Sequence, residues 1–204
     1  MRDVLRSDAA FDALYPADVR KRSANHWTPV AVALQAAELL APEDGMRVLD
    51  VGAGGGKLCC VGALATPAHT TWAGIEQDPQ LVDVARELAT RLELADRVAF
   101  HHGDMAMLDW DEFDSIYLFN PFESDLVGEN YIETRQRWAL FGREVTRVED
   151  WLAQLASGTR VVTYHGFGGE MPDSYSLAAM EHIGSGPLAL WIKRPNRNGM
   201  TLEG

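Results

Sequence analysis

The stretch RVLDVGAGGGK, residues 47–57, decides the fold of this chain. Its first residues are mostly apolar and branched, which is typical of a strand covered on both faces. Four of the next five residues are glycines, which allow positive φ and leave bare backbone for a ligand. The apolar segment LCCV at residues 58–61 then predicts a helix whose first N–H groups point back into the turn. The stretch therefore predicts a strand, a glycine turn and a helix around a ligand site.

Three classes of ligand use such a turn, and the spacing of this one separates them. A phosphate-cradling loop needs a glycine at residue 51 and a Ser or Thr at residue 58, where this chain has Val51 and Leu58. The dinucleotide fingerprint needs its third glycine where Lys57 stands. What remains is the pattern Asp-x-Gly-x-Gly-x-Gly, headed by Asp50. A carboxylate there suits a positively charged ligand rather than a pyrophosphate.

A second acidic residue follows the next predicted strand, residues 70–75. The strand ends at Glu76, followed by Gln77, and Glu76 lies 26 residues after Asp50. A carboxylate at the carboxyl end of the neighbouring parallel strand can accept hydrogen bonds from both hydroxyls of a ribose. Glu76 is therefore the candidate ribose ligand.

A third predicted strand, residues 97–102, ends in Gly103, Asp104 and Met105. Asp104 is positioned to accept from an adenine amino group, and Met105 to line the ring. The pair His101-His102 falls on this strand, where neighbours point to opposite faces, and no acid or cysteine framework surrounds it. No metal site is predicted.

The fourth predicted strand, residues 113–119, ends in Asn120-Pro121-Phe122. It is expected beside the first strand, at the switch point where ligands bind in doubly wound sheets. There Asn120 presents an amide and Phe122 an aromatic face, while proline fixes the backbone. A proline turn that merely closes a strand is the alternative.

The flanking segments complete the predicted order. Residues 1–25 predict a loose helical arm, and Thr28 and Pro29 predict the N-cap and first position of a helix over residues 30–40. Beyond the fourth strand we expect a long helix over residues 131–156, a strand over residues 159–164 and a hairpin formed by residues 175–182 and 188–193. The glycine-rich loop at residues 165–169, which begins with His165, lies at the same edge as the site and is a candidate mobile lid.

Taken in order, these features resemble the class I S-adenosyl-L-methionine (SAM)-dependent methyltransferases over residues 28–194. Asn120-Pro121-Phe122 is also similar to the Asn/Asp-Pro-Pro-aromatic motif of amino-group methyltransferases, with one proline missing. The resemblance implies an α/β fold with a doubly wound, mostly parallel seven-stranded sheet of the Rossmann-like type and a C-terminal antiparallel hairpin. Residues 1–27 would form an N-terminal arm and residues 195–204 a C-terminal tail.

The resemblance also implies a cofactor, SAM, and roles for individual residues. The acceptor would be a nucleophile, nitrogen by preference, of a protein side chain or a small molecule. The catalytic set comprises Asn120, Pro121, Phe122 and His165, with His165 a candidate base. The cofactor-binding set comprises Thr28, Asp50, Gly52, Ala53, Gly54, Gly56, Glu76, Gln77, Asp104, Met105 and Asn120.

Composition bounds the class of protein. A chain of 204 residues, 47% hydrophobic and 24% charged, predicts one globular domain with its own core. The net charge of −12 disfavours nucleic acid as a partner, because phosphate binding needs basic residues. No membrane span or disulfide is predicted, and the adjacent Cys59 and Cys60 look like core residues, so the expected compartment is the cytoplasm. Two other functions stay open at this point: a nicotinamide-dependent oxidoreductase and a non-catalytic SAM-binding interaction module.

Overall fold

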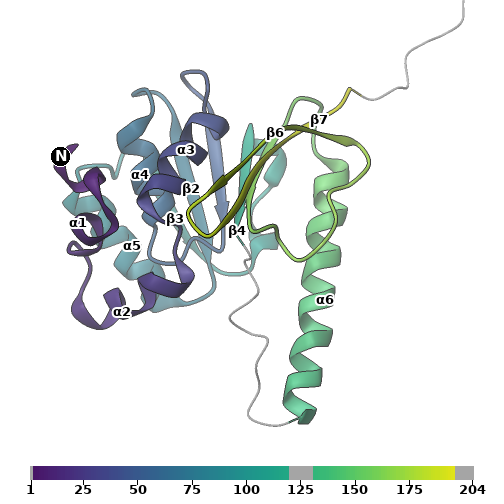
Figure 1. Cartoon of the computed structure of the whole chain (residues 1–204), viewed down its shortest axis with the longest axis horizontal. Coiled ribbons are helices and arrows are strands. Elements are labelled where there is room, and N and C mark those ends of the chain that lie inside the picture. Colours follow the sequence, from purple (N-terminus) through teal and green to yellow (C-terminus); the bar gives the residue numbers. More distant parts are fainter. Residues whose placement is uncertain (1, 120–130, 196–204) are drawn as a thin grey trace, which may run out of the picture.

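A computed structural model of the chain describes residues 2–119 and 131–195 (Figure 1). Its centre is a seven-stranded sheet with the order β3-β2-β1-β4-β5-β7-β6. The strands are β1 (Arg47–Val51), β2 (Thr71–Glu76), β3 (Val98–His102), β4 (Ser115–Phe119), β5 (Arg160–Tyr164), β6 (Tyr175–Ile183) and β7 (Gly186–Lys193). Strands β1 to β5 pair in parallel, and β7 is antiparallel to both of its neighbours. The predicted mostly parallel sheet with a C-terminal antiparallel hairpin is confirmed.

Helices cover both faces of this sheet. In Figure 1, α3, α4 and α5 lie on one face and α6 on the other. The helices are α1 (Asp8–Asp12), α2 (Ala17–His26), α3 (Val30–Leu40), α4 (Lys57–Ala65), α5 (Pro79–Arg91) and α6 (Tyr131–Gln154), with 3-10 turns η1 (Arg2–Arg6), η2 (Met105–Met107) and η3 (Trp110–Glu112). None of the helices in the described ranges has the length and hydropathy that crossing a bilayer requires.

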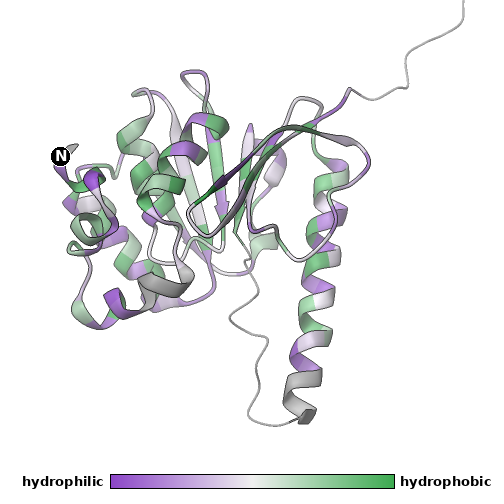
Figure 2. Cartoon of the chain, viewed as in Figure 1, coloured by the Kyte–Doolittle hydropathy of each residue, from purple (hydrophilic) through white to green (hydrophobic). Residues whose placement is uncertain are grey.

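The core explains why the buried positions of the central strands are mostly apolar. Val48 of β1 packs with α3, α4 and α5, whereas Leu49 packs against α6 on the opposite face. Because successive side chains of a strand point to opposite faces, a strand between two helical layers is apolar at most positions. Helix α6 packs on the sheet with one side only, and Figure 2 shows hydrophobic and hydrophilic residues alternating along it.

Two predictions made from local pattern are wrong. Thr28 is not the N-cap of α3: the helix begins at Val30, whose N–H donates to Asp8 Oδ1 at 2.8 Å. The Thr28 hydroxyl instead pairs with the Tyr117 hydroxyl at 3.0 Å. The apolar positions of the predicted helix over residues 131–156 would place Trp138 in its buried stripe. Trp138 is instead 54% exposed, because α6 packs on the sheet further along, through Val145, Val148 and Leu152.

Residues 2–26 are not a loose arm. They form η1, α1 and α2, and Phe11 and Tyr15 lie within the buried cluster that also contains α3 and α4. Arg91 of α5 donates to the carbonyl oxygen of Leu14. The division of the chain at residues 27 and 195 into arm, domain and tail remains a prediction.

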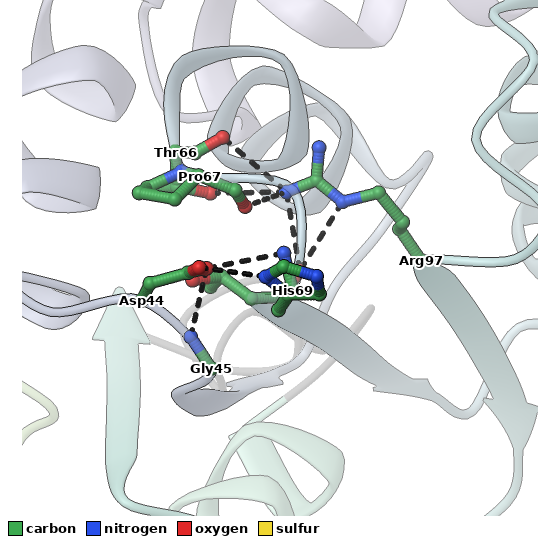
Figure 3. Close-up of polar contacts among 7 residues, drawn as sticks. Asp44, Gly45, Thr66, Pro67, His69 and Arg97 are labelled. Atoms are coloured by element: carbon green, nitrogen blue, oxygen red, sulfur yellow. Dashed lines mark hydrogen bonds and ion pairs between the residues drawn. The ribbon is translucent and has the colours of Figure 1, made fainter.

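The amino-terminal edge of the sheet is closed by polar contacts (Figure 3). The Arg97 guanidinium, just before β3, donates to the carbonyl oxygens of Ala63 at 2.7 Å and Pro67 at 2.6 Å. The Asp44 carboxylate accepts from the backbone N–H of His69 at 3.1 Å and lies 2.7 Å from its ring Nδ1. These contacts fix the loop between α4 and β2 on the side of the sheet away from the glycine turn.

Strand β6 is one of the two edge strands of the sheet. Its side chains are mostly exposed, Leu177 and Met180 among them. The pairing with β7 shifts by one residue between Leu177 and Ala179, so Ala178 forms an irregularity in the ladder. Such bulges are common at sheet edges.

Candidate functional site

The candidate site lies at the carboxyl edge of the parallel strands. The order β3-β2-β1-β4 places the ends of these four strands side by side. The backbone N–H of Gly103, after β3, donates to the carbonyl oxygen of Glu76, at the end of β2, at 2.9 Å. The structure therefore brings Asp50, Glu76 and Asp104 to one edge of the sheet, where doubly wound folds bind ligands.

The glycine turn between β1 and α4 is tied to β2 by backbone hydrogen bonds. The N–H groups of Gly52 and Ala53 both donate to the carbonyl oxygen of Ile75, at 2.9 and 3.0 Å. The φ angles of Gly52 (79°), Gly54 (52°) and Gly56 (80°) are positive, a region that glycine adopts without strain. The sequence of the turn is thus dictated by its backbone path.

Gly56 has a packing role in this turn. A Cβ on Gly56 would lie 2.4 Å from Phe100 of β3 and 2.9 Å from Ala85 of α5. Its missing side chain therefore lets α4 approach the sheet and α5. Gly54 and Gly55 instead face the aromatic rings of the N-terminal segment.

Glu76 fixes the turn and keeps acceptor capacity. Its Oε2 accepts from the N–H of Gly54 at 2.9 Å, and its Oε1 accepts from the N–H of Asp78 at 2.9 Å. A carboxylate has about four acceptor positions, so two protein donors leave room for two more. Glu76 is half-buried, and the next residue, Gln77, is exposed.

Asp50 is buried directly behind the turn. It lies in β1 beside Tyr117 of β4, and the Cys59 thiol of α4 donates to its Oδ2 at 3.8 Å. Burial raises the pKa of the Asp50 carboxyl to about 7; the bond from Cys59 opposes the rise and the negative charge of Glu76 adds to it. A cationic group bound nearby would favour the ionised form.

Asp104 lies at the same edge, but its carboxylate is engaged by α6. Its Oδ1 accepts from Arg147 Nη2 at 2.7 Å and from the N–H of Ala106 at 2.8 Å, and its Oδ2 accepts from Arg147 Nη1 at 3.2 Å. The Arg147 guanidinium lowers the pKa of Asp104. Met105 is buried, and its carbonyl oxygen accepts from Trp110 Nε1 at 3.1 Å. Asp104 and Arg147 are 43 residues apart, so no local pattern indicates this pair.

Two aromatic side chains of the N-terminal segment cover the glycine turn. A Cβ on Gly54 would lie 3.3 Å from Trp27 Nε1, and one on Gly55 would lie 3.1 Å from both Trp27 and Tyr15. The Tyr15 hydroxyl donates to the carbonyl oxygen of Gly55 at 3.1 Å. Within the part of the chain that the structure describes, Trp27 Nε1 donates to no acceptor. From the sequence alone, Trp27 has two interpretations, an aromatic plug at the start of the next helix or a substrate contact, and Tyr15 has no assigned role.

A buried cation holds this segment in place. Lys57, the first residue of α4, places its Nζ 2.6 Å from Asp8 Oδ1 and 2.7 Å from Asp12 Oδ1. Asp8 also accepts from the N–H that begins α3. Lys57, which stands where a dinucleotide fingerprint has its third glycine, therefore joins α1 and α3 to α4, the helix that follows the glycine turn.

The carboxyl ends of β4 and β5 hold the remaining predicted residues. Asn120, Pro121 and Phe122 lie outside the described residues. His165 follows β5, with a positive φ of 56°, and its ring stacks on Phe119 at 5.8 Å between centroids. Its Nε2 lies 3.0 Å from the Ser185 hydroxyl, in the turn between β6 and β7.

One cleft lies away from this edge. A cleft of about 600 Å³ over β2 and β3, which includes Thr71, Ala73, Ala99 and Met107, contains none of the predicted site residues. Within residues 2–119 and 131–195, no three His, Cys, Asp or Glu side chains are placed to bind a metal ion. The carboxyl edge is the candidate site.

Comparison with known proteins bears on what this edge does. A family described as "Methyltransferase domain" matches residues 42–148, more than half of the chain. Comparison with curated proteins gave no match. An RNA methyltransferase from Salinibacter ruber, solved in complex with S-adenosyl-L-homocysteine, is 24% identical and superimposes with a TM-score of 0.55, covering 80% of this chain and 91% of that chain.

Two further solved structures have the same fold. A proposed O-methyltransferase from Klebsiella pneumoniae is 15% identical, with a TM-score of 0.63 and coverage of 95% of this chain and 94% of that chain. TrmN from Thermus thermophilus is 20% identical, with a TM-score of 0.61 and coverage of 87% of this chain and 52% of that chain. At these identities the likeness shows the Rossmann-like fold alone.

The matched residues include β1, the glycine turn, β2 and β3, and thus the three carboxylates at the carboxyl edge. Family, fold and strand order agree with one another. The chain belongs to the methyltransferase-domain family, whose methyl donor is SAM.

Proposed function

We propose that this protein transfers the methyl group of SAM to a nitrogen of a protein side chain or a small molecule. The observation that carries the proposal is the side-chain-free turn flanked by Glu76 and Asp50 at one edge of the sheet. Carboxylates in this arrangement favour a ligand that combines a ribose with positive charges.

The residues present fit SAM as the donor. The two unused acceptor positions of Glu76 match two ribose hydroxyls. The bare backbone of Gly52 and Gly54 leaves space for the methionine part, and Asp50 behind the turn favours its ammonium. The Trp27 indole N–H, beside Gly54, is a donor suited to the methionine carboxylate. Bound there, SAM supplies an activated methyl group on a sulfonium.

The acceptor is expected at the ends of β4 and β5. In this proposal the Asn120 amide oxygen accepts an N–H of the acceptor nitrogen, which turns its lone pair toward the methyl group, and Phe122 provides a flat contact. His165 takes the proton that the nitrogen loses. A lysine acceptor, whose ammonium ordinarily has a pKa of about 10.4, must lose a proton before it can attack. The preference for nitrogen rests on the similarity of Asn120-Pro121-Phe122 to amino-group methyltransferases.

Charge bears on the class of acceptor. The chain has a net charge of −12, and binding to a phosphate backbone depends on the number of phosphates that basic residues neutralise. We therefore favour a protein or small-molecule acceptor, although the solved structures of similar fold include an RNA methyltransferase. Membership of the methyltransferase-domain family favours methyl transfer over a nicotinamide-dependent oxidoreductase.

Two experiments test the proposal. Calorimetric titration with SAM and S-adenosylhomocysteine should show binding, and titration with NAD should show none. Incubation with methyl-labelled SAM and fractionated lysate should then label one fraction, with the label on nitrogen. Asn120→Ala should lose far more in label transfer than in SAM binding, because its amide is expected to contact both the donor and the acceptor nitrogen. NAD binding without SAM binding would overturn the proposal, and SAM binding without label in any fraction would support the non-catalytic module instead.

A further inference from the structure

Three polar side chains are joined at the end of β5, beside the expected acceptor position. His165 Nε2 lies 3.0 Å from Ser185 Oγ, which lies 3.1 Å from the Tyr164 hydroxyl. The Tyr164 hydroxyl also lies 3.1 Å from the carbonyl oxygen of Ile183 and 3.0 Å from the backbone N–H of Ser185. The group spans from β5 to the turn between β6 and β7.

The acceptor at the end of this chain fixes the direction of every hydrogen bond in it. A carbonyl oxygen can only accept, so the single proton of the Tyr164 hydroxyl is donated to Ile183. The Tyr164 oxygen must then accept the proton of the Ser185 hydroxyl. Ser185 in turn has only acceptor capacity left for His165, whose Nε2 must therefore carry a hydrogen.

We propose that Tyr164 and Ser185 are positioning residues that hold neutral His165 as the Nε2–H tautomer, so that Nδ1 is the atom that accepts a proton from the acceptor nitrogen. This inference rests on the proposed function for its substrate. It adds Ser185, which the sequence alone does not place in the site, gives Tyr164 a positioning role, and assigns the base to one atom.

The surroundings of the ring agree with a fixed orientation. His165 has a left-handed backbone conformation that is uncommon for a residue other than glycine, and its N–H donates to the carbonyl oxygen of Pro187 at 3.0 Å. The ring stacks on Phe119 on one side. On another, a Cβ at Gly186 would lie 2.2 Å from its Cε1, so the ring rests against bare backbone.

Nδ1 is left able to react. Among the described residues no group forms a hydrogen bond with it, and the His165 side chain is exposed to solvent. In the transfer step, the acceptor nitrogen forms a bond to the methyl carbon as the carbon–sulfur bond breaks, with its electron pair going to sulfur. The proton that the nitrogen loses goes to Nδ1, and the imidazolium then releases it to water.

The tautomer is measurable without an acceptor. In long-range proton–nitrogen NMR spectra of ¹⁵N-labelled protein, at a pH where the imidazole is neutral, the two ring nitrogens of His165 should give the pattern of the Nε2–H form. Ser185→Ala should move the two shifts toward each other, and Ser185→Thr should restore them. Tyr164→Phe removes the acceptor of the serine proton, so Ser185 turns to Nε2 and the Nδ1–H form should increase.

A matched control lies in the same hairpin. The Ser176 hydroxyl donates to the carbonyl oxygen of Ile192 at 3.4 Å, away from His165, so Ser176→Ala should leave the His165 shifts unchanged. The proposal is overturned if the wild type has the Nδ1–H pattern. It is also overturned if Ser185→Ala and Tyr164→Phe give wild-type shifts, or if Ser176→Ala moves them as far.

Binding and transfer separate this inference from the proposed function. Ser185→Ala, Tyr164→Phe and His165→Asn should all bind S-adenosylhomocysteine as the wild type does. With the labelled lysate fraction, His165→Asn should transfer label about 100-fold more slowly, as expected for loss of a base. A wild-type rate in that variant would overturn the role of His165. If the wild-type protein binds S-adenosylhomocysteine but labels no lysate fraction, the proposed function is overturned. The tautomer of His165 measured by NMR would not be affected by that outcome.

Discussion

Asp50 and Glu76 are carboxylates of neighbouring strands with opposite surroundings. Glu76 is half-buried and accepts two backbone N–H groups, which stabilise its charge. Asp50 is 5% exposed and has a thiol as its partner, so its charge is costly in the absence of a cation. At the scale of single residues, one acid holds the turn in shape and the other titrates near neutral pH.

Replacement of Glu76 tests the ribose contact. Glu76→Gln should weaken SAM binding by about 1–3 kcal/mol, because charged acceptors are lost for both the Gly54 N–H and the ligand. Calorimetric titration measures the change. Glu38→Gln, an exposed residue of α3, is the control and should bind as the wild type does. Equal affinities of the two variants would show that Glu76 does not contact the donor.

Asp50 makes stability depend on pH. Its pKa is about 7 in the folded protein and about 3.9 when unfolded, so between these values the folded state binds more protons. At low pH the Asp50 carboxyl should therefore raise the free energy of unfolding. This contribution should fall by up to about 4 kcal/mol as the pH rises from about 4 to about 7. Asp50→Asn should remove that fall. Urea unfolding at pH 5 and pH 8 measures it, and an equal effect of the variant at both pH values would contradict the buried acid.

The N-terminal helices and α4 behave as one element. Lys57 in the first turn of α4 contacts two carboxylates of α1, and Tyr15 and Trp27 contact the glycine turn just before α4. Local pattern predicts no more than weak helical character for the arm, because these contacts join residues more than 25 positions apart. Loss of the arm should therefore disturb the turn itself.

The buried cation offers a test of that connection. Lys57→Met should destabilise the protein by about 3 kcal/mol, because it removes a buried ammonium that contacts both Asp8 and Asp12. Adding Asp12→Asn to that variant should recover part of the loss. Arg6→Ala breaks an exposed pair with Asp3 and should cost less than about 1 kcal/mol. Chemical denaturation compares the three, and equal losses for Lys57→Met and Arg6→Ala would mean that α1 is not anchored through Lys57.

Two helical glycines should respond in opposite directions to the same change. A Cβ on Gly62 of α4 would lie 2.3 Å from the buried Trp72, whereas one on Gly142 of α6 would meet nothing within 4 Å. Gly142→Ala should stabilise the protein by about 0.5–1 kcal/mol through helix propensity. Gly62→Ala should destabilise it by about 1–3 kcal/mol through overpacking. Thermal unfolding gives both signs, and a stabilised Gly62→Ala would show that α4 can move away from β2.

At the scale of the whole molecule, the sequence predicts the sheet better than the site. Strands such as 159–164 are predicted to within a residue or two, because an apolar run between turn residues is a local signal. The carboxylates at the edge follow from the same logic, since the ends of parallel strands meet. The engagement of Asp104 by Arg147 and the cover of Gly55 by Tyr15 join residues 43 and 40 positions apart, and no local pattern encodes them.

The irregularity at Ala178 bears on the tendency of the protein to aggregate in solution. The unpaired backbone N–H and C=O groups of a long, regular edge strand can pair with another chain and start fibrous assembly. A bulge disrupts that pairing. Deletion of Ala178 would leave Leu177 and Ala179 as consecutive partners of Trp191 and Leu190, giving an even edge with Met180 exposed beside it. Concentrated solutions of the deletion variant should scatter more light over days than those of the wild type. One extra alanine would then be what keeps this protein colloidally stable at high concentration.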